Sequence, residues 1–464
     1  MKKLILLALA LPSLAFAQPV GDQAAALRDA ALAGDTLAWE IVEGLTTEVG
    51  PRQAGTEAEA RARDWAVRRL TALGFSNVHV EPFDMPVWMR GEERAEIVSP
   101  FPQPLVVTAL GNSGATPAAG IEAELVGFDS VAALQAAPDS AVRGRIVFID
   151  HAMTPTQDGS GYGQFGAARR QGPTIASRKG AAAIVVRSIG TDYHRNPHTG
   201  VQSFGEGARP IPAGALTVPD AEQLRRILAR AGARGSPVRM RLTLTPRNIG
   251  RRQSGNVVAE VPGSDPDAGV ILIGGHLDSW DLGTGAIDNG AGVAITVAAA
   301  HRIMQAGRPR RTIRIVLFGA EEVGGGGGAT HFRLHRETGN VVLVGESDFG
   351  ADRVWRVEFK LAPANAALAD RVAALLAPLG IARGANPAGA GADLSEWIGA
   401  GWAAIDLSQD GTRYFDYHHT PDDTLDKIDP AQLRQNVAAW TAMLAAVADA
   451  PETITAMAAS PPAR

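Results

Sequence analysis

The sequence has no cysteine among its 464 residues. This absence excludes structural disulfides, thiolate zinc sites and a cysteine nucleophile. Any metal site in the chain must therefore be built from histidine and carboxylate side chains.

Positive charge is also in short supply. The chain has 44 basic and 49 acidic residues and a net charge of −5, so it offers no basic field to collect a polyanion. Nucleic acid is therefore not expected as a partner. Glycine (52) and proline (29) are too few to indicate low-complexity disorder. With 45% hydrophobic residues, the chain can form one large domain or two ordinary ones.

Long apolar runs are missing as well, which predicts no membrane span. The apolar run at residues 4–11 is far shorter than the roughly 20 residues that a membrane span needs. It follows Lys2 and Lys3 and precedes Ala15-Phe16-Ala17, which is the pattern of a cleaved signal peptide. We predict that residues 1–17 are removed and that the protein is secreted or periplasmic. Their loss removes two lysines and no acid, so the net charge falls from −5 to −7.

The chain is predicted to contain an insert within a larger α/β domain. Thr56 and Glu59 form a capping box for a helix over residues 56–73. A polar stretch at residues 112–117 has the composition of a domain boundary, and strands are expected at 145–150, 182–187 and 238–244. We therefore divide the mature chain into the first part of the main domain (18–115), an insert of α+β type (116–247) and the rest of the main domain (248–464).

After residue 248 strands and helices alternate, which predicts a mostly parallel sheet with helices on both faces. Strands are expected at 270–274, 312–318, 341–344 and 403–407, and helices at 290–305, 365–376 and 430–447. In such a sheet, ligands bind beyond the carboxyl ends of the strands. The polar residues that follow these apolar runs, or lie in a late loop, are His276, Asp278, Asp288, Glu321, Glu322, Glu346, Asp348, His418 and His419.

Buried carboxylates are costly to desolvate unless they are paired or coordinate a cation, so this set predicts a metal site. Histidine and carboxylate ligands suit Zn²⁺, and a centre with two ions needs one carboxylate to bridge them. We assign Asp288 as the bridge. His276 and Asp348 would complete one site, and Glu322 and His419 the other.

Two further acids have predicted catalytic roles at this centre. Glu321 stands beside a ligand in the sequence and is left free to accept a proton from the attacking water as general base. Asp278 lies two residues after His276 and is placed to accept the second ring N–H of that histidine, which would fix its tautomer.

The combined motifs resemble those of a known family, the co-catalytic zinc aminopeptidases and carboxypeptidases related to bacterial leucyl aminopeptidase. The likeness is strongest to its plasma glutamate carboxypeptidase (carboxypeptidase Q) branch. It is carried by His276-x-Asp278, Gly285-Ala286-x-Asp288-Asn289-Gly290-Ala291-Gly292, Glu321-Glu322, Glu346-Ser347-Asp348, His419-Thr420-x-x-Asp423-Thr424 and the early stretch at residues 45–52. Residues 142–147 and 179–183 resemble a protease-associated domain, which implies that type for the insert.

The resemblance implies a zinc exopeptidase fold and the same five metal ligands and base. This chain departs from the family pattern at one position, because several relatives have an oxyanion-stabilising tyrosine where this chain has His418. An imidazole N–H can donate the same hydrogen bond, so His418 is a candidate for that role. Asp393 stands where relatives often have a polar residue lining the site.

Several alternatives stay open from the sequence. One is a glutaminyl cyclase with a single zinc ion on a similar fold, which release of ammonia from N-terminal Gln would reveal. Another is a binding ectodomain without catalysis, against which the intact ligands and Glu321 argue. Gly324-x-Gly326-x-x-Ala329 fits a loose dinucleotide fingerprint, but a pyrophosphate would meet Glu321 and Glu322 there. His194 and His198 have the spacing of a helical zinc pair, but Pro197 between them argues against a helix there.

The expected function is that of an exported exopeptidase with two zinc ions per chain, acting through metal-activated water on the N-terminal peptide bond of dipeptides or short peptides. The insert is expected to wall the active-site cleft and to exclude folded proteins. The acidic site favours a free N-terminal ammonium, so N-acetylated peptides should be poor substrates. The resemblance also implies a possible homodimer.

Overall fold

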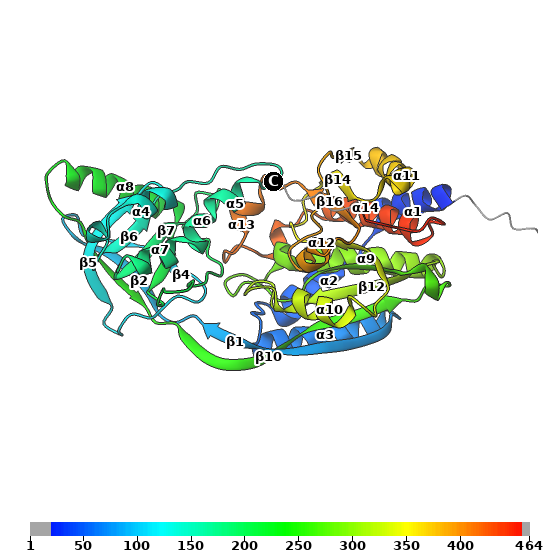
Figure 1. Ribbon diagram of the computed structural model, residues 1–464, viewed down its shortest axis with the longest axis horizontal. Helices are drawn as coiled ribbons and strands as arrows, with labels where there is room; N and C mark the ends of the chain where they lie inside the picture. The colour runs from blue at the N-terminus through cyan, green and yellow to red at the C-terminus, as the bar shows by residue number, and fades with distance from the viewer. Residues whose placement is uncertain (1–19, 457–464) are drawn as a thin grey trace, which may run out of the picture.

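The computed structural model describes residues 20–456, and the predicted signal peptide lies outside them. Two mixed sheets form the two ends of an elongated molecule (Figure 1). The long strands β1 (Ser76–Met89) and β10 (Arg247–Val261) run side by side from one end toward the other. Among the described residues, no helix is both long and apolar enough to cross a membrane.

The first sheet has eight strands, and its four central strands are parallel as the sequence predicts. The strands that flank this centre, β10 and β14 (Val354–Lys360), run antiparallel to it, so the sheet as a whole is mixed. In spatial order, the strands are β1 (Ser76–Met89), β10 (Arg247–Val261), β12 (Thr312–Phe318), β11 (Val270–His276), β13 (Val341–Glu346), β16 (Ala404–Gln409), β14 (Val354–Lys360) and β15 (Ala382–Arg383).

Both faces of the first sheet are buried, and successive side chains along its central strands point to opposite faces. Ile271 and Ile273 of β11 belong to one large core, whereas Leu272 points to the opposite core, where Trp397 is packed. The helices around this sheet are α1 (Val20–Gly34), α2 (Leu37–Gly44), α3 (Glu57–Ala72), α9 (Ala291–Ala306), α10 (Gly326–His335), α11 (Ala366–Leu376), α12 (Ser395–Gly399), α13 (Tyr414–Tyr417) and α14 (Pro430–Ala448). The predicted α/β fold with helices on both faces is thus present.

The second sheet also has eight strands. In spatial order, they are β3 (Gln103–Leu105), β2 (Glu93–Ser99), β9 (Arg239–Leu244), β5 (Ile121–Phe128), β6 (Ile146–Ile149), β7 (Ala183–Arg187), β8 (Ala213–Leu216) and β4 (Val107–Ala109). Its helices are α4 (Val131–Ala136), α5 (Gly161–Phe165), α6 (Ala167–Arg170), α7 (Gly172–Arg178) and α8 (Val218–Gly232). We call residues 93–244 the second-sheet region. Its first strand begins before residue 116, where the sequence placed the start of the insert.

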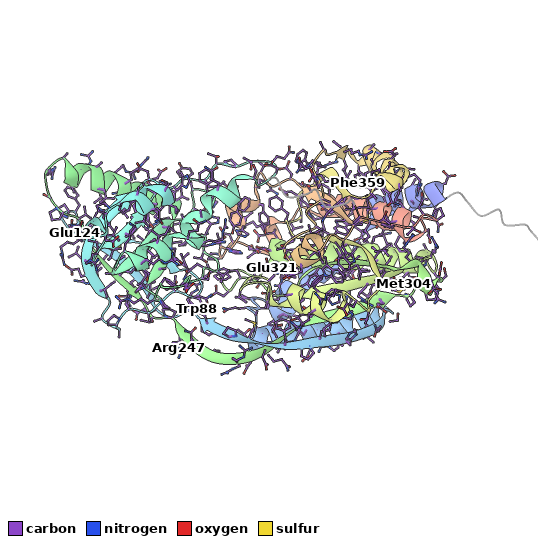
Figure 2. All side chains as sticks on the ribbon, in the orientation of Figure 1. Trp88, Glu124, Arg247, Met304, Glu321 and Phe359 are labelled. Atoms are coloured by element: carbon purple, nitrogen blue, oxygen red, sulfur yellow. The ribbon has the colours of Figure 1, made fainter. Side chains whose placement is uncertain are left out.

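The path of the chain explains how this region is attached. The chain leaves the first sheet at the end of β1 and returns at the start of β10, and these two strands are antiparallel neighbours. Trp88 lies near the point where the chain leaves the first sheet, and Arg247 lies where it returns; the two are close together in Figure 2. The region is therefore held beside the carboxyl ends of the central strands.

Candidate metal centre

The predicted ligands gather where the central strands of the first sheet end. His276 is the last residue of β11, Glu321 and Glu322 follow β12, and Asp348 follows β13. Asp288 lies in a short turn, η4 (Ala286–Gly290), just before α9, and its own backbone is not helical (φ −130°, ψ 86°). His418 and His419 follow α13. Figure 2 shows Glu321 near the junction between the two ends of the molecule.

Asp288 faces two separate groups of ligands with its two oxygens. Its Oδ1 lies 3.0 Å from His276 Nε2, which is also 3.3 Å from Asp348 Oδ1. Its Oδ2 lies 3.5 Å from His419 Nε2, which is 2.7 Å from Glu322 Oε2. The structure thus brings together all five predicted ligands, with one histidine and one carboxylate on each side of Asp288.

Asp278 supports this arrangement mainly through the turn that carries Glu321. Its carboxylate accepts hydrogen bonds from the backbone N–H groups of Glu321 (3.1 Å) and Glu322 (3.3 Å). The nearest acceptor to His276 Nδ1 is the backbone carbonyl of Asp278 at 3.0 Å, and the carboxylate lies 3.5 Å away. The residue is therefore placed to fix both the histidine and the acidic turn.

His418 lies inside the centre, stacked on His419 with ring centroids 3.6 Å apart. Its Nε2 is 3.4 Å from Asp288 Oδ2, and its buried Nδ1 has no hydrogen-bond partner among the described residues. Burial and the neighbouring His419 hold the pKa of His418 well below its usual value. A neutral ring with a free polar atom can donate or accept at the site, and its role in oxyanion stabilisation stays a prediction.

Residues of the second-sheet region hold His419 in place, which sequence reasoning did not find. His419 Nδ1 lies 3.2 Å from the carbonyl of Thr199, and this carbonyl also accepts a hydrogen bond from Arg169. Thr199 Oγ1 accepts a hydrogen bond of 2.6 Å from Trp280 Nε1, and the Trp280 ring stacks on His419. A Cβ at Gly200 would lie 2.6 Å from His419 Nδ1, so this contact needs a glycine.

Asp288 is positioned by two buried residues of opposite charge. Asp423 accepts hydrogen bonds from the backbone N–H groups of Ala286, Ile287 and Asp288. Arg52, which is 0% exposed, donates to the carbonyls of Leu277, Thr284 and Gly285. Both belong to motifs that carried the family resemblance, and their contacts show what those motifs do in this fold.

We expect Arg52→Lys to lower the thermal stability of the protein and its affinity for metal. One lysine ammonium cannot reach three carbonyls that a guanidinium fork spans, and each buried carbonyl left without a donor costs about 1–3 kcal/mol. The melting temperature and metal binding of the variant measure the effect. Arg68→Lys is the matched control, because Arg68 is exposed on α3. Unchanged stability in Arg52→Lys would contradict the role given to the buried guanidinium.

The centre carries an excess of buried negative charge. Burial, together with Asp348, Asp288 and Asp278, raises the pKa of Glu321 to about 8. Burial and the Asp288 carboxylate raise the pKa of Asp423 to about 7 and that of Glu322 well above its usual value. Carboxylates and imidazoles in this crowded arrangement fit cations, because an ion would neutralise the acids and take up the imidazole lone pairs.

Asp393 lies at the edge of this acidic centre. Both of its carboxylate oxygens are buried with no hydrogen-bond partner among the described residues, and so is Glu346 Oε1. Burial and the charge of Glu321 raise the pKa of Asp393 well above its usual value. The backbone N–H of Asp393 donates to Glu346 Oε2 (3.1 Å), which places Asp393 next to this second buried acid.

The other motifs have local structural roles. A Cβ at Gly327 or Gly328 would lie 2.3 Å from the Gly319 carbonyl or 2.1 Å from the Asp393 carbonyl, so these glycines permit close backbone packing. His198 contacts Asp192 and the backbone carbonyl of His418. His194 is exposed. Neither of these two histidines belongs to a group with metal-ligating geometry in the part of the chain that the structure describes.

A cavity of about 200 Å³ lies between the first sheet and the second-sheet region. Trp280 lines this cavity, and its ring also stacks on His419. Its other lining residues come from both parts of the chain and include Gln53, Trp88, Asn112, Val201 and Val323. This places a side-chain-sized space next to the ligand cluster.

Comparison with known proteins gives consistent matches. Residues 256–444 match the family described as peptidase family M28. Human carboxypeptidase Q is 35% identical over 438 residues, which cover 94% of this chain and 90% of that protein. Carboxypeptidase Q from Xenopus laevis is 33% identical over 437 residues, covering 93% of this chain and 91% of that protein.

Solved structures resemble the chain over nearly its full length. The crystal structure of a peptidase M28 precursor from Shewanella amazonensis SB2B is 44% identical and matches with a TM-score of 0.91, covering 95% of this chain and 99% of that chain. An aminopeptidase from Aneurinibacillus sp. strain AM-1 is 19% identical with a TM-score of 0.62, covering 94% and 98% of the two chains, and shares the fold.

Proposed function

Because the chain belongs to peptidase family M28 and is a metallo-exopeptidase, we propose that it is an exported enzyme with two zinc ions that removes the N-terminal residue from dipeptides or short peptides. The observation that carries this proposal is the position of Asp288. Its Oδ1 lies 3.0 Å from His276 Nε2, and its Oδ2 lies 3.5 Å from His419 Nε2. A carboxylate shared by two ligand groups is what a two-ion centre requires.

The ligand sets would divide into one site of His276, Asp348 and Asp288, and another of His419, Glu322 and Asp288. Histidine and carboxylate ligands of this kind suit zinc. Zinc bound there would polarise the scissile carbonyl and lower the pKa of water. Three protein ligands for each ion leave a position open for substrate or solvent.

The chain's own residues supply the remaining steps. Glu321 accepts the proton of the attacking water and later delivers it to the leaving amine. The turn that bears Glu321 is fixed by the Asp278 carboxylate through two backbone hydrogen bonds. His418 is placed to donate a hydrogen bond to the developing oxyanion.

Substrate size is limited by the second-sheet region in this proposal. Thr199 of that region contacts His419, and Val201 lines the cavity beside it, so the ligand cluster is walled on this side. The free carboxylate oxygens of Asp393 and Glu346 favour the ammonium group of a substrate N-terminus. Both features support cleavage of short peptides from their amino end.

We expect rapid cleavage of a dipeptide, much slower cleavage of its N-acetyl form, and no internal cuts in a long unfolded polypeptide. Acetylation removes the ammonium that the acidic pocket favours, and the wall excludes a chain running through the site. Mass spectrometry of the three reactions identifies each product, with the Glu321→Gln variant as control for contaminating peptidases. Equal rates on all three substrates, or internal fragments from the polypeptide, would refute the proposed specificity.

Export is tested separately. The mature protein is expected to begin at Gln18, because the basic, apolar and small-residue segments end at Ala17. N-terminal sequencing of protein recovered from the periplasm or the medium measures this directly. A mature N-terminus at Met1 would show that the segment is retained.

A further inference from the structure

A second cluster of metal-ligating side chains lies at the edge of the first sheet. Glu81 is on β1, and His331 and His335 are one helical turn apart on α10. Glu81 Oε2 is 2.9 Å from His331 Nδ1, and Glu81 Oε1 is 2.6 Å from His335 Nε2. His79 lies two residues before Glu81 on the same strand, with its Nε2 3.9 Å from Glu81 Oε1. We call these four residues the Glu81 cluster.

The Glu81 cluster is separate from the centre around Asp288. In the order of strands, β10 and β12 lie between β1, which carries Glu81, and β11, which ends in His276. The cluster also uses α10, which supplies none of the ligands assigned above. Its chemistry therefore needs an explanation of its own.

Burial leaves one polar atom of the cluster without a partner. His331 is 0% exposed, and its Nε2 has no hydrogen-bond partner in the described part of the chain. Glu81 is also buried, and a hydrogen bond of 3.2 Å from Asn256 Nδ2 holds its Oε2. His335 is partly exposed and leaves the cluster open to solvent. The Glu81 cluster is therefore held in place by hydrogen bonds, and an ion can reach it from solvent.

The geometry suits one divalent ion. One ligand atom from each of Glu81, His331 and His335 can be chosen so that all lie within 4.8 Å of one another. Ligands about 2 Å from a tetrahedral zinc ion lie about 3.3 Å apart. These side chains would therefore have to move apart only slightly to admit an ion.

We propose that Glu81, His331 and His335, with His79 beside them, form a second divalent-metal site that takes Zn²⁺ or a similar imidazole-binding ion. The bound ion ties α10 to the edge strand β1. Because α10 follows the loop that carries Glu321 and Glu322, this tie also holds that loop against the sheet. Hydrogen bonds from the two histidines to Glu81 are the competing explanation, and they require no ion.

Zinc counting on matched variants separates the two explanations. The double variant His331→Gln/His335→Gln is compared with His301→Gln, which changes a partly buried histidine on α9. Each change is made both in the wild-type chain and in the Asp288→Ala chain. The proteins are loaded with ZnCl₂, freed of excess metal and analysed for zinc per chain. Circular dichroism confirms that they are folded.

We expect the double variant to hold one zinc ion fewer than His301→Gln in both backgrounds. In the Asp288→Ala background, added ZnCl₂ should also raise the melting temperature of the His301→Gln protein and leave that of the double variant unchanged. Because the readout is a difference between matched proteins, it does not depend on how many ions the Asp288 centre binds. Equal zinc counts in both backgrounds would overturn the proposal and leave a hydrogen-bonded network.

A single variant keeps the test decisive if the double variant does not fold. His335 is partly exposed, so His335→Gln should fold. Loss of a ligand should weaken zinc binding in the Asp288→Ala background by at least about tenfold, the loss seen when even an outer-shell partner is removed. An unchanged affinity would overturn the proposal.

Discussion

Glu321→Gln is expected to lower kcat by roughly 10²–10⁴-fold, the usual contribution of a general base. Glutamine keeps the shape of the side chain and its hydrogen-bonding capacity but cannot accept a proton. The backbone N–H of residue 321 still donates to Asp278, so the acidic turn should keep its conformation. Steady-state kinetics on a dipeptide, with elemental analysis of the same preparation, measures turnover and metal content together.

The matched control for this prediction is Glu337→Gln. Glu337 is an exposed glutamate shortly after α10, so its replacement changes net charge equally without touching the centre. It should retain full activity and full metal content. Turnover close to that of the wild type in a fully metallated Glu321→Gln protein would give the role of base to another residue.

The centre of the fold was predictable because local pattern and burial agree there. The strand expected at residues 312–318 is β12, and the helix expected at 430–447 is α14 with one further residue. Both are dominated by side chains in the core. The strand β10 was not identified because it begins with exposed residues, among them Arg251 and Arg252, and only its later half is buried. A strand with one solvated half gives no continuous apolar signal.

Motif spacing identified the predicted ligands, which the structure brings together, but not the groups that contact them. His276, Glu322 and Asp348 each follow a predicted strand, so the carboxyl edge of one sheet brings them together. Thr199 contacts His419 from a loop 220 residues earlier, and it does so through a backbone carbonyl. A carbonyl carries no residue-type signal. The neighbouring Gly200 is required by the close approach, but among 52 glycines it does not stand out in the sequence.

The largest loss of metal is expected from Asp288→Ala, which should empty both zinc positions of the Asp288 centre. Removing this carboxylate leaves His276 with Asp348 on one side and His419 with Glu322 on the other. Two protein ligands for each ion are fewer than the three that hold catalytic zinc. Asp348→Ala removes a ligand from one side alone and should mainly lose one ion. Activity should fall to background in Asp288→Ala because no polarised carbonyl or activated water remains.

Elemental analysis of the wild type, Asp288→Ala and Asp348→Ala provides the measurement, with Asp267→Ala as control at an exposed position. The decisive quantity is the difference from the wild type, because an ion at the Glu81 cluster adds equally to every protein in the series. A difference of two for Asp288→Ala and one for Asp348→Ala follows from a bridging carboxylate with oxygens on both sides. A difference of one for both variants would mean that Asp288 serves a single ion, and the two-ion mechanism would then fail.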